Sequence, residues 1–229
     1  MDHMDYFKSW EDYQMAFEDL SAQSEDVIWP DEVAEYEGEM GLPGAHNLMN
    51  AGLAAQIARR IGVSEDTIAD TLKEYKGAWR RFEFKGPTVE GALIYDDYAH
   101  HPSEIQATLE GAREKYPEAR IVAVVQPHQY SRTAALLDGF AESFENADEV
   151  IIPNIYEARD HSRDKESVSA ESLVKELQKG GVKARFGEGL SKTAEFIKEH
   201  SDEFDVVITM GAGDVDTIAD AISKPKIID

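Results

Sequence analysis

Residues from about 90 to the C-terminus alternate between short β-rich runs and longer amphipathic patterns, and this alternation constrains the fold more than any other feature. The β-rich runs are "GALIYDDYA", "ARIVAVVQP", "DEVIIPNIY", "VKARFG" and "FDVVITMGAG". The helical patterns are "SEIQATLEGAREKY", "TAALLDGFAESFENA", "SAESLVKELQKGG", "SKTAEFIKEHS" and "DVDTIADAIS". Strands separated by helices of this length predict βαβ units and a mostly parallel sheet. Right-handed crossovers then give an open, doubly wound α/β domain of the Rossmann-like class.

Polar motifs follow the predicted strands directly. They are "DDYAHHP", "QPHQYSRT", "NIYEARD" and "GAGD". In open α/β sheets, ligands bind beyond the carboxyl ends of the strands, so we expect these four motifs to gather at one edge. For each motif alone, a polar loop or a tight turn is the simpler interpretation, and "GAGD" lacks the full G-x-G-x-x-G spacing. Four such motifs in one sheet favour a functional site.

Residues 1–79 have a different pattern and are predicted to form a separate, helix-rich piece, with residues 80–229 as the α/β domain. Helices are expected at "SWEDYQMAFEDLSAQ", "HNLMNAGLAAQIARRIG" and "SEDTIADTLKEYKG", and a short strand at "DVIWP". In the second helix, His46, Asn47 and Asn50 serve either to cap and pack the helix or to bind an anionic ligand at its N-terminus. In "WRRFEFKG", Arg80 and Arg81 either pair with Glu83 or grip a phosphate.

Charge and composition exclude several classes of function. The formal net charge is −23, which argues against a nucleic-acid groove and against docking on an anionic membrane. Cysteine is absent, which removes disulfides, thiolate metal sites and a cysteine nucleophile. There is no long apolar run and no signal-peptide pattern, so a cytoplasmic protein is expected. His3, flanked by Asp2 and Asp5, is either part of a tail or a ligand for Mg²⁺.

Taken in chain order, these motifs resemble the UDP-N-acetylmuramate–L-alanine ligases of the Mur ligase family. The resemblance rests on "DHMDYF", "GAHNLMNAGLAA", "RRFE", "DDYAHHPSEI", "QPHQYSRT", "ADEVIIPNIYEARD" and "GAGD", and it covers almost the whole chain. It implies a C-terminal domain preceded by part of a central, ATP-binding domain. The implied reaction is ATP-dependent amide formation, in which the muramyl carboxylate of UDP-N-acetylmuramate becomes an acyl phosphate that the amine of L-alanine attacks.

The resemblance also implies roles for individual residues. His3 corresponds to a metal ligand for Mg²⁺, and the nucleotide-binding positions are His46, Asn47, Asn50, Arg81 and Asp97. Positions for the amino acid and the muramyl carboxylate are Tyr98, His100, His128, Tyr130 and Arg132. Of these, the catalytic positions are His100, His128 and Arg132.

One departure from the family pattern shapes the functional hypotheses. No G-x-x-G-K-[ST] loop occurs in the 229 residues, so ligation by this chain alone is not expected. The alternatives are a non-catalytic binding module that complements a separate N-terminal half, a murein peptide ligase, and a remnant that only folds.

Overall fold

The computed structural model describes residues 6–223, and the chain divides into two compact units, Met1–Tyr75 and Lys76–Asp229. Each unit is described by itself. The division falls close to the boundary predicted between residues 79 and 80.

The first unit is helical. Its elements are α1 (Trp10–Ala22), the 3₁₀ turn η1 (Pro30–Glu32), α2 (Ala45–Arg60) and α3 (Glu65–Glu74). Ser9 caps α1 and Ser64 caps α3, and each side chain accepts a backbone N–H three residues on. The three predicted helices are therefore confirmed. The strand predicted at "DVIWP" is wrong, because those residues pair with no strand among residues 6–223 and run into η1.

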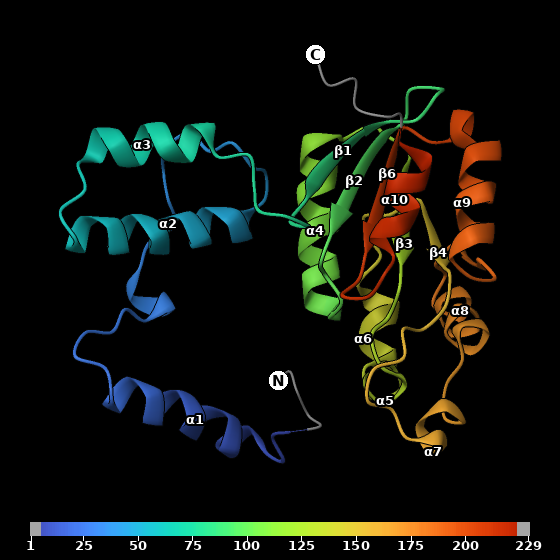
Figure 1. The fold of residues 1–229 in the computed structure, drawn as a ribbon, viewed down its shortest axis with the longest axis horizontal. Coiled ribbons are helices and arrows are strands. Elements are labelled where there is room, and N and C mark those ends of the chain that lie inside the picture. Colours follow the sequence, from blue (N-terminus) through green and yellow to red (C-terminus); the bar gives the residue numbers. More distant parts are fainter. Residues whose placement is uncertain (1–5, 224–229) are drawn as a thin grey trace. The chain divides into compact units, whose positions relative to one another are not determined.

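The second unit contains a six-stranded sheet in the order β1-β2-β6-β3-β4-β5 (Figure 1). The strands are β1 (Glu83–Pro87), β2 (Leu93–Asp97), β3 (Ile121–Val125), β4 (Glu149–Ile152), β5 (Ala184–Phe186) and β6 (Val206–Met210). All neighbouring pairs are parallel except β1 with β2. This confirms the Rossmann-like, mostly parallel α/β class. The antiparallel edge strand β1 was not predicted.

The helices of the second unit follow the strands as the alternation predicts. They are α4 (Pro102–Lys115), α5 (Tyr130–Ala135), α6 (Leu137–Glu142), α7 (Ser162–Lys165), α8 (Ala170–Lys179), α9 (Leu190–Glu199) and α10 (Asp216–Ile222), with a 3₁₀ turn η2 (Ser201–Glu203). The single helix predicted at "TAALLDGFAESFENA" is instead two short ones, α5 and α6, which meet at Leu136.

The sheet is covered on both faces, as a doubly wound fold requires (Figure 1). On β3, Ile121, Ala123 and Val125 face one buried cluster, and Val122 and Val124 face the other. The first cluster includes side chains from α4, α6 and α8, and the second includes side chains from α9 and α10. Apolar side chains thus occupy both faces of the central strands, which accounts for their continuous hydrophobic runs.

Candidate functional site

The predicted polar motifs meet at the carboxyl edge of the sheet. Because β2, β3, β4 and β6 are parallel, their carboxyl ends lie at the same edge, and each is followed by one of the four motifs. The most direct link between them is a series of aromatic rings. Tyr98 contacts His100 at 5.6 Å between ring centroids, His100 contacts His128 at 6.0 Å, and His128 stacks on Tyr156 at 5.4 Å. Segments after β2, β3 and β4 therefore form one continuous surface.

His100 is oriented by a hydrogen bond. Its Nδ1 lies 3.0 Å from the carbonyl oxygen of Tyr98 and 3.4 Å from Oε2 of Glu104. Both partners are acceptors, so Nδ1 carries the proton, and in the neutral ring the lone pair is on Nε2. The carboxylate of Glu104 also accepts the backbone N–H groups of His100 and His101, which anchors the loop to the start of α4. His100 thus presents a hydrogen-bond acceptor from a rigid loop.

His128 lies in a different environment. Its Nδ1 is buried and has no hydrogen-bond partner among residues 6–223. Burial lowers the pKa of His128, and the positive charge of Arg132 and the nearby ring of His100 lower it further. His128 therefore stays neutral at pH values where an exposed imidazole would begin to take up a proton.

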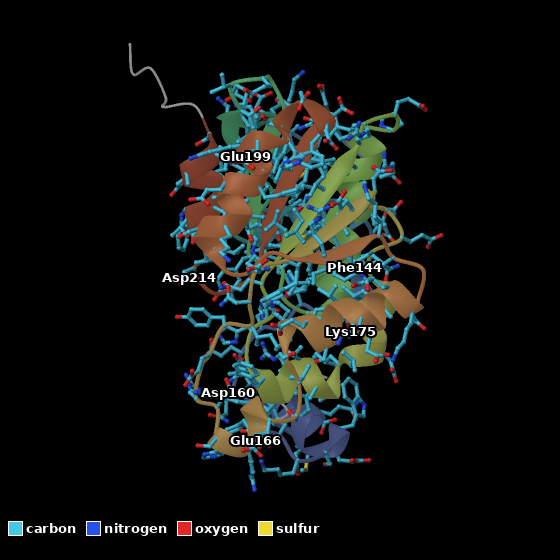
Figure 2. The ribbon with its side chains drawn as sticks, turned by 90° about the vertical axis from the view of Figure 1, so that its right-hand side faces the viewer. Phe144, Asp160, Glu166, Lys175, Glu199 and Asp214 are labelled. Carbon is cyan, nitrogen blue, oxygen red and sulfur yellow. The ribbon has the colours of Figure 1, made fainter. Side chains whose placement is uncertain are left out.

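Gln126 joins the ends of three strands. This buried side chain follows β3, and its Nε2 donates to Oδ1 of Asn154 at 3.2 Å and to Oδ1 of Asp214 at 2.8 Å. Asn154 follows β4, and Asp214, labelled in Figure 2, follows β6. Within the described part of the chain, the amide oxygen of Gln126 is buried without a hydrogen-bond partner beside Gly213, where an added Cβ would lie 2.5 Å from it. A side chain at position 213 would force Gln126 and Tyr156 to shift, which accounts for one glycine of the "GAGD" motif.

The two carboxylates at the end of β2 are both buried and both engaged within the unit. Asp97 Oδ2 accepts the backbone N–H of Phe82 at 2.7 Å, and its Oδ1 accepts that of Ala99 at 2.8 Å. Burial raises the pKa of Asp97, and the two backbone donors oppose that shift. Asp96 accepts hydrogen bonds from Thr209 and Arg80. Asp97 was predicted to bind nucleotide, and in this structure its oxygens hold the segment before β1 against β2.

Arg80 forms the most extensive polar network of the edge. Its guanidinium donates to Asp96 at 2.7 Å, to the carbonyl of Gly211 at 2.7 Å and to the carbonyl of Gly213 at 2.8 Å. The interpretation of Arg80 as a surface ion-pair partner of Glu83 is wrong. The Glu83 carboxylate accepts the backbone N–H of Arg80 and does not contact its guanidinium. Arg81 is exposed, and its guanidinium lies 5.6 Å from the ring centroid of Tyr98. Of the two arginines, Arg81 is the one that a phosphate could reach.

The start of α5 is held by a carboxylate from the following crossover. Oδ1 of Asp160, labelled in Figure 2, accepts the backbone N–H groups of Tyr130 at 2.9 Å and Ser131 at 3.3 Å. Gln129 has a φ of 69°, which turns the chain into the helix. The turn places Tyr130 at the start of α5 and Arg132, which is buried, two residues further along the helix. Both predicted residues are therefore in the segment that carries His128.

Three of the predicted nucleotide-binding residues belong to the first unit. His46, Asn47 and Asn50 are in the first turns of α2, in the first unit. The prediction that asparagine caps this helix is wrong, because the N-cap is Gly44 and Asn47 Nδ2 instead donates to the carbonyl of Pro43. His46 and Asn50 are exposed.

The predicted metal ligand cannot be placed. His3 lies outside the described residues. Among residues 6–223, no three histidine or carboxylate side chains are grouped so that they could hold a metal ion. The described residues therefore contain no such group by themselves, and Mg²⁺ ligation by His3 stays a prediction. Over the same residues, no helix is both long and apolar enough to cross a bilayer.

Polar and aromatic side chains at the carboxyl edge of a doubly wound sheet define a ligand-binding α/β domain. Comparison with known proteins narrows this class: residues 80–213 match the family described as "Mur ligase, glutamate ligase domain". The chain therefore belongs to the Mur ligase family.

Curated relatives and solved structures agree with this membership. The chain is 45% identical over 177 residues to the UDP-N-acetylmuramate–L-alanine ligase of Caldanaerobacter subterraneus, a match that covers 77% of this chain and 38% of the relative. The crystal structure of a UDP-N-acetylmuramate–alanine ligase from Thermotoga maritima superposes with a TM-score of 0.65 at 28% identity, covering 80% of this chain and 38% of that one. A murein peptide ligase from Psychrobacter arcticus gives a TM-score of 0.57 at 25% identity, covering 83% and 40%. The chain thus spans about two fifths of the length of these relatives.

Three residues of the edge were not singled out from the sequence. Gln126 and Tyr156 stood inside quoted motifs, but nothing in their spacing distinguished them from ordinary loop residues. Arg80 was noted only beside Arg81. The signal that could have identified it is the position three residues before an edge strand, from which a long cationic side chain can reach the carboxylates that end the neighbouring strand.

Proposed function

We propose that this chain supplies the amino-acid-binding domain of an ATP-dependent ligase that joins L-alanine to UDP-N-acetylmuramate. The observation that carries the proposal is the series Tyr98, His100 and His128, which comes from two strand ends that are not adjacent in the sheet and meets at one edge. Sequence similarity to a named ligase of that specificity supports it. A cytoplasmic location belongs to the same proposal.

In this proposal, the two histidines have different roles at the reacting amine. An incoming amino acid must lose a proton from its ammonium group before the nitrogen can attack an activated carboxyl group. His100 can accept that proton at Nε2, because Nδ1 is held by the carbonyl of Tyr98. His128 stays neutral and adds no positive charge that would repel the ammonium group. The positive charge of Arg132, close enough to lower the pKa of His128, suits the carboxylate of the amino acid.

The nucleotide is proposed to bind beside these residues. Arg81 is exposed beside Tyr98 and can reach an anionic phosphate, whereas Asp97 acts by holding the backbone of Phe82 and Ala99. When bound, Mg²⁺ would neutralise phosphate charge, with His3 as the proposed ligand from this chain. The 229 residues contain no G-x-x-G-K-[ST] sequence, so the loop that grips the phosphates is proposed to come from a segment outside them.

A ligation assay tests the proposal. The purified chain is incubated with ATP, Mg²⁺, UDP-N-acetylmuramate and L-alanine, with and without a P-loop-bearing N-terminal half of a related ligase, and the alanyl product is sought by mass spectrometry. We expect product only when that half is added. His128→Ala should abolish it, and His200→Ala should not, because His200 ends α9 at the other edge of the sheet and hydrogen-bonds the carbonyl of Phe196.

Each remaining outcome selects another hypothesis. Product from the chain alone would contradict the requirement for a separate phosphate-gripping segment. Association with the added half but no product would indicate a non-catalytic binding module, and neither association nor product would leave a domain that only folds.

A second candidate substrate is a murein peptide, because a murein peptide ligase shares this fold at 25% identity. Replacing L-alanine by L-alanyl-γ-D-glutamyl peptides in the same assay separates the two. Product with the peptide and none with L-alanine would favour the second candidate.

A further inference from the structure

Tyr156 contacts His128 through both backbone and ring, although no site role was predicted for it. Its backbone N–H donates to the carbonyl of Pro127 at 2.8 Å, and its carbonyl accepts the backbone N–H of Gln129 at 2.9 Å. His128 and Tyr156 thereby form an isolated parallel bridge. The segment after β4 is thus hydrogen-bonded to the two residues that flank His128. These bonds fix the position of the Tyr156 side chain relative to that of His128.

The rings of the two residues lie face to face. The imidazole of His128 and the phenol of Tyr156 are stacked with an interplanar angle of 16° and a centroid distance of 5.4 Å. Gly213, in the turn after β6, closes off the phenol ring: a Cβ added there would lie 2.4 Å from Cδ2 of Tyr156. The phenol ring therefore has little room to turn away from the imidazole.

The stacking matters because His128 lacks the usual means of orientation. A functional imidazole is normally held by a hydrogen bond at the nitrogen that does not face the ligand. His100 has such a bond, to the carbonyl of Tyr98. His128 has none among residues 6–223, and its Nδ1 is buried without a partner. That leaves Nε2 as the nitrogen that could contact a ligand. Among the described residues, ring contacts with Tyr156 on one side and His100 on another orient the imidazole.

We infer that Tyr156 is a positioning residue, which holds the imidazole of His128 by ring stacking in place of a hydrogen bond and so directs Nε2 toward the ligand. This inference rests on the proposed function only for the identity of that ligand, an amino acid. The phenol hydroxyl has no part in it. The aromatic ring is what matters, so phenylalanine should replace Tyr156 and an aliphatic side chain should not.

The test is histidine NMR on the intact chain, which needs no substrate. In the wild-type protein we expect nuclear Overhauser contacts between the ring protons of His128 and Tyr156, with the His128 signals, identified by their loss in His128→Gln, shifted upfield by the phenol ring. Tyr156→Phe should preserve both effects and the pKa of His128. Tyr156→Leu and Tyr156→Met should remove the contacts and the upfield shift. Both should also raise the pKa of His128 toward that of an exposed imidazole, because water reaches the ring.

The charged and titratable groups near His128 are known, so a change in its pKa can be interpreted. They are Arg132 on α5, His100 after β2, and Arg159 and Asp160 after β4. None of them is altered by the Tyr156 variants. The control is Tyr116→Leu, which removes an aromatic ring that ends α4 and hydrogen-bonds Tyr95. It should lower stability and leave the His128 signals in place.

Two results would overturn the inference: no ring contact in the wild-type protein, or His128 signals and pKa unchanged in a folded aliphatic variant. If Tyr156→Leu does not fold, Tyr156→Met and the wild-type contacts decide. Titration of L-alanine into the wild-type chain separates this inference from the proposed function. If L-alanine leaves the His128 signals unmoved while the Tyr156 variants behave as expected, the positioning role stands and the proposed ligand is wrong.

Discussion

The two units of the chain differ in how they bury apolar side chains. In the second unit, two clusters of buried residues fill both faces of the sheet, and large side chains such as Leu109 and Phe140 are almost completely enclosed. In the first unit, α1 has no buried residue, and α2 buries only Ala51, Gly52 and Ala55. Many of its large apolar side chains are exposed: Trp10, Met15, Phe17, Leu20, Trp29, Ile57, Ile61 and Tyr75. Regular helices with good caps therefore do not by themselves make a core, and only the second unit has one that could support independent folding.

Separating the units should have the largest effect. Expressed alone, residues 76–229 should unfold cooperatively, with a stability in the usual range of about 5–15 kcal/mol. Residues 1–75 alone should lack fixed tertiary structure, because helices of this length are marginal in water without packing. Amide NMR spectra and thermal melts measure both. A cooperative melt of residues 1–75 would remove the distinction between the units.

Within the second unit, the largest single effect should come from Arg80→Met. The change leaves the carboxylate of Asp96 and the carbonyls of Gly211 and Gly213 buried without their donor. Breaking a buried ion pair in this way costs about 3–5 kcal/mol. Arg81→Met is the matched control: Arg81 is exposed and should change stability by no more than about 0.5 kcal/mol. Urea unfolding of both variants checks the prediction, and equal losses would contradict the role given to Arg80.

A pair of core truncations compares the units directly. Leu109→Ala, at a residue that is 0% exposed in the second unit, should cost about 2–5 kcal/mol in the unfolding of that unit. Ile68→Ala, at a residue that is 4% exposed in the first unit, should leave that transition unchanged. The unfolding of each unit is followed separately by residue-resolved hydrogen exchange. A shift of the second unit's transition in Ile68→Ala would mean that the two units fold together.

The smallest expected effect is a pH dependence from His128. The pKa of this group is lower in the folded chain than its ordinary value of 6.5, because burial disfavours the charged ring. The unfolded chain therefore binds the proton first as the pH falls. The free energy of unfolding should decrease from pH 6.5 downward, until the pH passes the folded pKa. His128→Gln should remove this part of the pH dependence. A variant with the same acid-side slope as the wild type would show that other groups cause it.

In the second unit, the sequence predicted the strands and helices correctly wherever the local pattern and the tertiary structure agree. Strand β3 is a continuous apolar run and β6 is apolar except for Thr209, and the gathering of His100 and His128 follows from the parallel arrangement. The sequence was insufficient where a distant partner decides the outcome. Strand β1 exists because β2 offers it a free edge, and its own residues, "EFKGP", contain a glycine and a proline that disfavour strands. "DVIWP" has strand-forming residues but pairs with no strand within residues 6–223.

The site was predictable to the same degree. Position after a strand predicted that the histidines and Arg132 lie at the carboxyl edge, because the strands of a parallel sheet end at the same edge. The contacts of Arg80, Gln126 and Tyr156 depend on which loops approach one another at the edge of the sheet, and neither composition nor periodicity contains that information. The carboxylate of Asp97 shows the converse: the position was predicted, but the backbone donors that occupy it come from segments on either side of β2.

The strand order has a consequence for synthesis of the chain. Strand β6 is the last to leave the ribosome, yet it lies between β2 and β3, which do not pair with each other. Until residues 206–210 have emerged, the nascent sheet is two separate pieces, each with an open apolar edge. The inner edges of both pieces are then available to other strands, including those of neighbouring nascent chains. Completion of this sheet is therefore delayed until β6 has emerged.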